Sequence, residues 1–238
     1  RPKRKMPGIG QLPGSLKIYS EPLGVVLIIA PWNYPFLLSM GPIIGALASG
    51  NTVLVKPSAY ASATSRLVKS LCEEIFPRGL VQVVEGGREE NKALLEEKFD
   101  YIFFTGSPAV GKTVMRAASK HLTPVTLELG GKSPCIVDAT ADIIKTAKRI
   151  LFGKLLNAGQ TCIAPDYIYV EEKVKDELIE ELLSGIKKNF PITDPFPSTF
   201  PKIIQTKHYQ RLHQLLEGQS LLYPFLTEGA LSREQSQQ

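Results

Sequence analysis

The sequence of 238 residues lacks long hydrophobic runs and the basic-then-apolar start of a secretory leader. Its longest strongly apolar run, Val25–Ala30, is far too short to cross a bilayer, which takes about 20 apolar residues in a helix. The basic residues at Arg1–Lys5 are followed by proline and glycine rather than by an apolar segment. We therefore expect no membrane segment and no signal peptide.

Cysteine and histidine are also scarce. The three cysteines, Cys72, Cys135 and Cys162, form no CxxC pair and cannot all be paired with one another. This usage is typical of free thiols in a reducing compartment, so we expect a cytoplasmic protein. The three histidines form no ligand-like grouping, so we expect no metal site.

Acidic residues are missing from the first 20 positions, which carry five basic residues: Arg1, Lys3, Arg4, Lys5 and Lys17. The whole chain has 28 Lys+Arg and 23 Asp+Glu, so residues 21–238 balance at 23 against 23. A nucleic-acid-binding protein needs a basic face that runs through its fold, and this distribution argues against one. We interpret the start of the chain as a solvated basic arm.

The sequence does contain short apolar runs that alternate with segments of helical periodicity. The runs that we interpret as strands are Val25–Ala30, Thr52–Val55, Val81–Val84, Tyr101–Phe104, Val125–Leu129, Cys135–Val137 and Tyr167–Val170. Apolar stripes at helical spacing lie over Leu67–Ile75, Ile143–Leu155 and Val174–Ile186. Near-continuous β-branched strands separated by helices predict a doubly wound α/β fold, with helices on both faces of a parallel sheet, at least through residue 130.

The character of the chain changes beyond Phe190, where four prolines crowd one short stretch: Pro191, Pro195, Pro197 and Pro201. Such a stretch cannot form regular helix or a central strand. After it we expect a helical segment around Lys207–Glu217 and then a frayed polar end.

Two segments place candidate ligand-binding residues where predicted strands end. In TGSPAVGK, Thr105–Lys112, Gly106 permits a tight turn, and Ser107 with the first N–H groups of a helix can hold a phosphate. A purely structural turn explains this segment equally well. In GNTVLVKPSAY, Lys56 lies at the strand end where open α/β sheets bind ligands, although a solvated lysine is the simpler interpretation.

A third segment, NAGQTC, carries a candidate nucleophile. Gly159 breaks the preceding helix, so Cys162 is predicted to lie on an accessible loop. Cys72 lies on an apolar stripe and Cys135 at a strand start, which fits buried and inert thiols. Since an unperturbed thiol has a pKa of about 8.5, a nucleophilic thiol needs local positive potential to react near neutrality.

Two more segments, PWNYP and LELGGKSP, carry polar side chains beside buried strands. Asn33 follows a strand and precedes a helix, where its amide can donate to an oxyanion. Glu128 ends an apolar strand, where a carboxylate is costly unless it has a role or a partner. Taken alone, each is also explained by a turn asparagine or a salt-bridged glutamate.

Together, the segments PWNYP, VLVKPS, FFTGS, LELGGKSP and NAGQTC, in this order and at these separations, resemble the aldehyde dehydrogenase superfamily. The fuller TPVTLELGGKSPCIVD and GQTCIAPDYI are similar to its class 3 branch. The resemblance covers Leu16–Phe190 closely and Ile203–Gln219 more loosely. It implies a Rossmann-like NAD(P)-binding domain over residues 1–130 without its N-terminal helices, and part of an α/β catalytic domain over residues 131–238, irregular after residue 190.

The resemblance also implies a role for each candidate residue in the oxidation of a small-molecule aldehyde to a carboxylic acid. Cys162 is the implied nucleophile, which forms a thiohemiacetal and then a thioester. Asn33 and the Cys162 backbone N–H hold the oxyanion, and Glu128 activates the hydrolytic water. NAD or NADP is the implied cofactor, and the residues assigned to it are Lys56, Ser58, Gly106, Ser107, Gly111 and Leu129.

The chain departs from the family pattern in three respects. The family's usual glutamate after KPS is Ala59 here, which predicts tolerance of NADP. The stretch EEIFP, Glu73–Pro77, imitates a downstream segment that grips the nicotinamide ribose, but it belongs to a predicted helix and we interpret it as a coincidence. The remaining catalytic domain and the strands through which family members form homo-oligomers are expected to be missing.

Two other functions stay open at this stage. One alternative is a catalytically silent homologue, which carries out no reaction and binds at most a nucleotide. The other is an acylating reductase that passes the thioester to coenzyme A or phosphate. The glutamate of LELGGK, Glu128, argues against the reductase because hydrolysis needs a base at that position.

Overall fold

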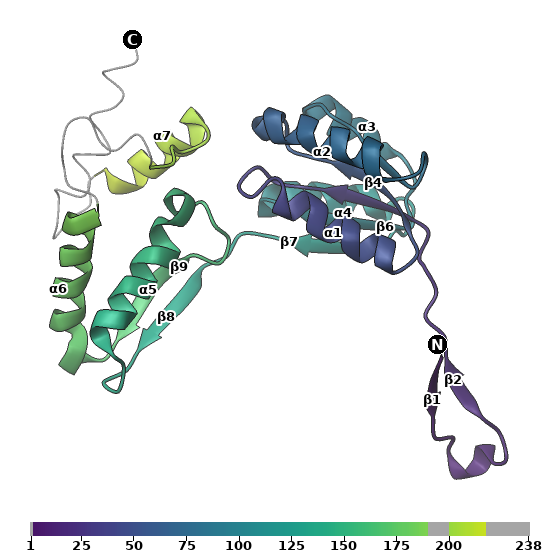
Figure 1. Ribbon diagram of the computed structural model, residues 1–238, viewed down its shortest axis with the longest axis horizontal. Coiled ribbons are helices and arrows are strands. Elements are labelled where there is room, and N and C mark those ends of the chain that lie inside the picture. The colour runs from purple at the N-terminus through teal and green to yellow at the C-terminus, as the bar shows by residue number, and fades with distance from the viewer. Residues whose placement is uncertain (1, 190–199, 218–238) are drawn as a thin grey trace. The chain divides into compact units, whose positions relative to one another are not determined.

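The computed structural model describes residues 2–189 and 200–217 of the chain. It divides into two compact units, Arg1–Leu129 and Gly130–Gln238, and each is described by itself (Figure 1). Most of the predicted proline-rich stretch and the predicted frayed end lie outside the described residues.

The first unit is built on a parallel sheet of five strands, in the order β5-β4-β3-β6-β7. The strands are β3 (Val25–Ile29), β4 (Thr52–Lys56), β5 (Val81–Val83), β6 (Tyr101–Thr105) and β7 (Val125–Glu128). The chain winds outward from β3 to β5 and then returns to β6 on the other side of β3. This reversal confirms the predicted doubly wound sheet, and its switch point lies between β3 and β6.

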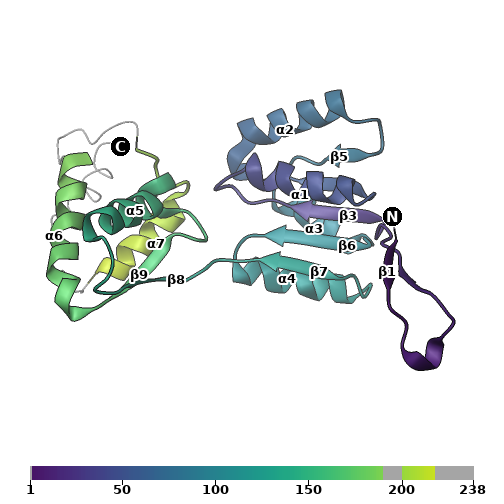
Figure 2. The same cartoon turned by 60° about the horizontal axis from the view of Figure 1, so that its bottom comes forward.

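Two pairs of helices cover opposite faces of this sheet (Figure 2). Val26 and Ile28 of β3 face α1 (Leu37–Ala48) and α2 (Ser62–Ile75). Leu27 and Ile29 face α3 (Arg88–Glu96) and α4 (Pro108–Ser119). Because successive side chains of a strand point to opposite faces, the unbroken apolar run of β3 fills both cores.

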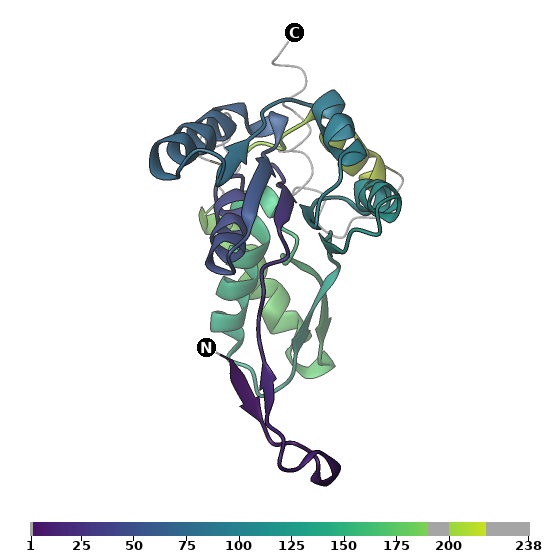
Figure 3. The same cartoon turned by 90° about the vertical axis from the view of Figure 1, so that its right-hand side faces the viewer.

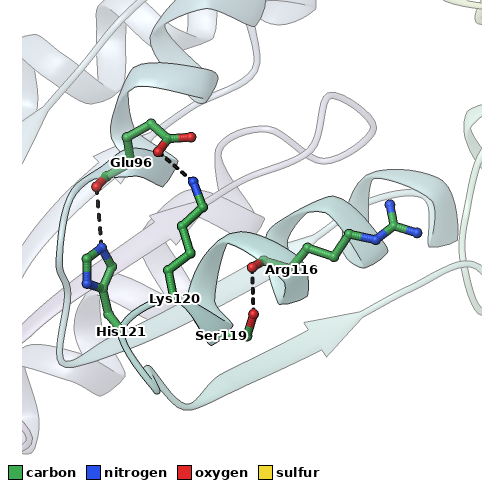
Figure 4. A network of polar contacts seen from close by, with 5 residues as sticks. All are labelled: Glu96, Arg116, Ser119, Lys120 and His121. Carbon is green, nitrogen blue, oxygen red and sulfur yellow. Dashed lines mark hydrogen bonds and ion pairs between the residues drawn. The ribbon is translucent and has the colours of Figure 1, made fainter.

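Polar contacts tie α3 to α4 at the C-terminal ends of both helices (Figure 4). Lys120 Nζ donates to Glu96 Oε2 at 2.6 Å, and this hydrogen bond lowers the pKa of the Glu96 carboxyl. His121 Nε2 lies 3.4 Å from the Glu96 carbonyl oxygen, and the buried Thr123 hydroxyl donates to Phe99 O at 2.8 Å. These contacts lie where β7 begins, at the end of the sheet opposite to the carboxyl ends of its strands.

The second unit pairs β8 (Ser133–Val137) with β9 (Pro165–Val170) in parallel. Helices α5 (Ile143–Leu155) and α6 (Glu172–Asn189) cover one face, and α7 (Thr206–Leu216) follows later in the chain. The core of the unit consists of Val137, Ile143, Ala147, Ile150 and Leu178. These elements lie where the sequence predicts strands and helices, which confirms an α/β architecture here too.

The basic N-terminal segment forms a short hairpin, shown in purple in Figure 3. Strand β1 (Lys3–Lys5) pairs antiparallel with β2 (Leu16–Ile18), and the 3-10 helix η1 (Ile9–Gln11) lies between them. All six strand residues are exposed, in line with a solvated basic segment. The pairing itself was not predicted, because three-residue strands carry too short an alternation to recognise.

Candidate active site

Four adjacent strands of the first unit end at one edge of the sheet and bring predicted site residues there. Lys56, the last residue of β4, lies opposite Ile29 of β3, and Ile29 also lies opposite Phe104 of β6. Glu128, the last residue of β7, lies opposite Thr105 of β6. In open α/β sheets this carboxyl edge, at the switch point, is where ligands bind.

Lys56 is buried, with 1% of its surface exposed, so its interpretation as a solvated lysine is wrong. Its Nζ donates to Pro57 O at 2.9 Å and to Gly86 O at 2.6 Å. Burial lowers the pKa of the Lys56 ammonium, and the nearby charge of Glu90 acts in the opposite direction. An ammonium has three N–H donors, so one remains without an acceptor among residues 2–189 and 200–217.

Ser58, two residues after Lys56, caps the short 3-10 helix η2 (Ala59–Ala61). Its hydroxyl accepts the Tyr60 N–H at 3.3 Å, and its carbonyl accepts the Ser65 hydroxyl at 2.9 Å. These contacts fix the chain as it leaves β4. Position 59 is an exposed alanine, whereas the family pattern has glutamate there. This position therefore carries no negative charge.

The turn from β6 into α4 combines a glycine with a serine that caps the helix. The Gly106 N–H donates to Glu128 O at 2.9 Å, which joins this turn to the end of β7. A Cβ on Gly106 would lie 2.6 Å from Phe104 Cζ, so a larger residue here would have to displace the buried Phe104 ring. Ser107 caps α4, with its hydroxyl accepting the Val110 N–H at 3.4 Å. The positive end of a helix favours an anion here.

Gly111 and Leu129 bring α4 close to the end of β7. Gly111 is buried in the second turn of α4, and a Cβ there would lie 2.8 Å from Leu129 Cδ2. Leu129 belongs to the apolar cluster beneath this helix. Close packing between these two residues therefore holds the turn before α4 in place.

Asn33 and Glu128 complete the predicted residues of this edge. Asn33 is half-buried in the segment between β3 and α1. Glu128 is exposed, so the desolvation cost expected for a carboxylate on an apolar strand does not arise. The carboxylate of Glu128 is therefore accessible to water.

Cys162 lies in the second unit, on the loop between α5 and β9, and its side chain is exposed as predicted. Three consecutive residues before it have left-handed backbones: Asn157 at φ 52°, Ala158 at φ 53° and Gly159 at φ 73°. This conformation costs a non-glycine residue about 1–2 kcal/mol. The loop that presents the thiol is therefore strained and needs support from its surroundings.

Gln160 supplies part of that support. Its side-chain oxygen accepts the Ile204 N–H at 3.0 Å, and its Nε2 donates to Lys202 O at 3.2 Å. Lys132 and Lys154 both reach Asp166, at 3.1 Å and 4.0 Å, which ties the start of β8 and the end of α5 to β9. The Cys162 loop is thus bounded by polar contacts on both sides.

Gly131 lies close to the backbone of the Cys162 loop, since a Cβ there would lie 2.5 Å from the Cys162 carbonyl oxygen. We predict that Gly131→Ala lowers the free energy of unfolding by about 1–3 kcal/mol, because the new methyl group must displace backbone. Urea unfolding measures this. Gly130→Ala is the matched control: a Cβ on Gly130 meets nothing within 4 Å, so a change below about 0.5 kcal/mol is expected. Equal losses in both variants would contradict the close approach.

Some features became visible only in three dimensions. The Gly86 carbonyl that holds Lys56 comes from 30 residues away along the chain. Asn51 is buried, and its side chain accepts the N–H groups of Leu23 and Gly24 at 2.7 Å and 3.0 Å, which fixes the start of β3. The Gly-Asn pair after a helix was a possible signal for that role, but no sequence signal linked Gly86 to Lys56.

Neither a metal cluster nor a membrane-spanning helix occurs in the part of the chain that the structure describes. No group of three His, Cys, Asp or Glu side chains there could hold a metal ion. No helix among the same residues is long and apolar enough to cross a membrane.

The sheet order, the helices on both faces and the glycine turn at the switch point define an α/β protein of the doubly wound, Rossmann-like class. Comparison with known proteins makes this more specific. The sequence model of the aldehyde dehydrogenase family matches residues 10–235, and the chain belongs to that family.

Curated relatives are similar over most of this chain. The dimeric NADP-preferring aldehyde dehydrogenase of Canis lupus familiaris is 45% identical over 206 residues, which are 87% of this chain and 46% of that protein. The 4,4'-diaponeurosporen-aldehyde dehydrogenase of Staphylococcus aureus is 51% identical over 201 residues, 84% of this chain and 44% of that protein. The chain therefore spans less than half the length of the curated relatives that it matches.

Solved structures show the same fold. The substrate-bound state of Staphylococcus aureus AldH superposes with a TM-score of 0.82 at 48% identity, covering 91% of this chain and 47% of that one. Aldehyde dehydrogenase of Mycobacterium tuberculosis complexed with NAD+ gives 0.77 at 32% identity, covering 90% and 44%.

Proposed function

We propose that this chain belongs to an enzyme that oxidises an aldehyde to a carboxylic acid with NAD or NADP. The observation that carries the proposal is the exposed Cys162 thiol, presented on a strained, supported loop in a chain of the aldehyde dehydrogenase family. The test is to mix the purified chain with an aldehyde and either nucleotide and to follow the formation of reduced nucleotide. Nucleotide binding without any turnover would instead favour a silent homologue.

The carboxyl edge of the first unit fits a dinucleotide. Lys56 has a buried N–H donor to spare, and Ser107 with the first turn of α4 suits a pyrophosphate. Lys56 and Ser58 would hold the adenosine ribose, and Gly106 and Ser107 the pyrophosphate, with Gly111 and Leu129 packed behind them. When bound, NAD or NADP accepts the hydride that aldehyde oxidation releases.

The nucleophilic step belongs to Cys162. Its thiolate attacks the carbonyl carbon, a C–S bond forms, and the carbonyl oxygen takes up the electron pair as an oxyanion. The Asn33 amide and the Cys162 backbone N–H would donate to that oxyanion. Donors placed where charge develops are a large source of rate enhancement in acyl-transfer chemistry.

The hydrolytic step belongs to Glu128. Its carboxylate takes a proton from water as the water oxygen attacks the thioester carbon on Cys162, and the C–S bond then breaks to release the carboxylic acid and the thiolate. The exposure of Glu128 supports this role because water reaches it. A water-activating carboxylate also favours hydrolysis over transfer of the acyl group to coenzyme A or phosphate.

The alanine at position 59 bears on the choice between NAD and NADP. We expect the chain to bind NAD and NADP with affinities within about tenfold of each other, because no carboxylate at position 59 repels a 2′-phosphate. Ala59→Glu should weaken NADP binding by about tenfold or more and leave NAD binding unchanged. Calorimetric titration of both nucleotides measures this.

The matched control for that prediction adds the same charge elsewhere on the first unit. Met115 lies on the exposed side of α4 with 54% of its surface exposed, so Met115→Glu should change neither affinity. Strict selectivity of the unchanged chain for NAD would contradict the assignment of position 59.

A further inference from the structure

The buried ammonium of Lys56 depends on a turn that comes from another part of the chain. Lys56 ends β4, and β5 lies beside β4 with Val55 opposite Val83. The chain then runs from β5 into α3 through Gly86 and Gly87, so this turn passes beside Lys56. The Gly86 carbonyl accepts a hydrogen bond from Lys56 Nζ at 2.6 Å. The direction of the ammonium is therefore set in part by the position of Gly86.

Glu90 holds that turn. Its Oε2 accepts the Gly87 N–H at 2.6 Å, so the Glu90 carboxylate caps the N-terminus of α3 by binding the residue just before the helix. Hydrogen bonds from the Glu90 and Gly87 N–H groups lower the pKa of the Glu90 carboxyl, which keeps it charged. Gly86 has φ 130°, and a Cβ there would lie 2.3 Å from Glu90 Cδ. Glu90 and Gly86 thus lie in direct contact, with no room for a side chain between them.

Glu90 also acts on Lys56 through its charge. Among the described residues, Glu90 is the one charged group with a resolved effect on the Lys56 ammonium, and it favours the protonated form. Glu85, the acid just before the turn, lies 3.5 Å from Lys69 of α2 and is paired there. Position 59, three residues after Lys56, is alanine. The acid that supports the buried ammonium in this chain is therefore Glu90.

We propose that Glu90 is a positioning residue for Lys56. It fixes the peptide group whose Gly86 carbonyl orients the ammonium, so that the remaining N–H is ready for a ribose or phosphate oxygen of the nucleotide. The inference rests on the proposed function because that function assigns Lys56 to the cofactor site. It adds a residue outside the strand ends, on α3, to the determinants of nucleotide binding.

Two variants separate the two effects of Glu90. Glu90→Gln keeps an oxygen that can accept the Gly87 N–H but removes the charge, whereas Glu90→Ala removes both. Glu89→Gln is the matched control, because Glu89 is exposed in the same first turn of α3 and its charge has no resolved effect on Lys56. The chain is labelled with 13C at lysine Cε, the Lys56 signal is identified by its loss in Lys56→Arg, and its titration is followed by NMR. Affinities for NAD and NADP are measured by calorimetry.

We expect the titration midpoint of Lys56 to move to lower pH in Glu90→Gln and to stay in place in Glu89→Gln. Nucleotide binding should weaken by about tenfold in Glu90→Ala, by less in Glu90→Gln, and not in Glu89→Gln, as expected when a charge-assisted hydrogen bond that orders a site is lost. An unchanged Lys56 midpoint in Glu90→Gln, or equal affinities in all variants, would overturn the inference. If the unchanged chain binds neither nucleotide, the assignment of Lys56 to a cofactor site is wrong. The Lys56 titration then still shows whether Glu90 acts on the Lys56 ammonium.

Discussion

Cys162→Ala is expected to reduce aldehyde oxidation by at least about 10³-fold, because the variant has no nucleophile to form the C–S bond. The measurement is the rate of NAD or NADP reduction at saturating aldehyde, with the folded state of the variant checked by circular dichroism. The exposed thiol has no part in the apolar core of its unit, so the variant should unfold at the same urea concentration as the unchanged chain. We therefore predict that Cys162→Ala loses activity but keeps the stability of the unchanged chain.

The control for this variant is another cysteine of the same unit. Cys135 lies half-buried in β8 and packs against the core of the second unit, so Cys135→Ala should lower stability and leave turnover of the folded enzyme unchanged. If Cys135→Ala abolished turnover while Cys162→Ala retained it, the assignment of the nucleophile would be wrong.

Asn33→Ala is expected to lower kcat by about 10²–10³-fold, the typical cost of removing one oxyanion donor. The amide acts on charge that develops during the reaction, so KM and the affinity for the nucleotide should change much less. Steady-state kinetics and calorimetry measure these quantities on the same preparations. The control is Asn189→Ala at the end of α6, where the amide donates to the Gly185 carbonyl at 2.8 Å. A loss confined to KM would show that Asn33 binds substrate without stabilising the oxyanion.

The strands of the first unit could be predicted because each is a short β-branched run bounded by turn residues. Val25–Ile29 reads as a buried strand from its five apolar residues alone, and its burial on both faces follows from helices on both sides of the sheet. Helix α3 was harder to recognise, because only Leu94 and Leu95 of its nine residues contact the core and most of the others are charged. Packing against one side needs only a narrow apolar stripe.

In the candidate active site, the exposure of one side chain could be predicted from the sequence, but the contacts between distant segments could not. The accessible thiol followed from the polar and small residues before Cys162, and the structure confirms its exposure. The burial of Lys56 was not predictable, because the hydrogen bond that makes burial tolerable comes from Gly86. Likewise, the approach of Gly131 to the carbonyl of Cys162 depends on two segments that meet only after folding. Side chains that act locally are therefore easier to predict than those held by distant backbone.

If the chemistry passes through an acyl group on Cys162, that group can be trapped during turnover. The chain is mixed with an aldehyde and NAD or NADP, quenched in acid during the first turnover, digested and analysed by mass spectrometry. We predict that the acyl mass appears on the peptide that contains Cys162 and is absent when the nucleotide is left out. Oxidation of the aldehyde with no acyl group on Cys162, or with the group on Cys72 or Cys135, would contradict the account.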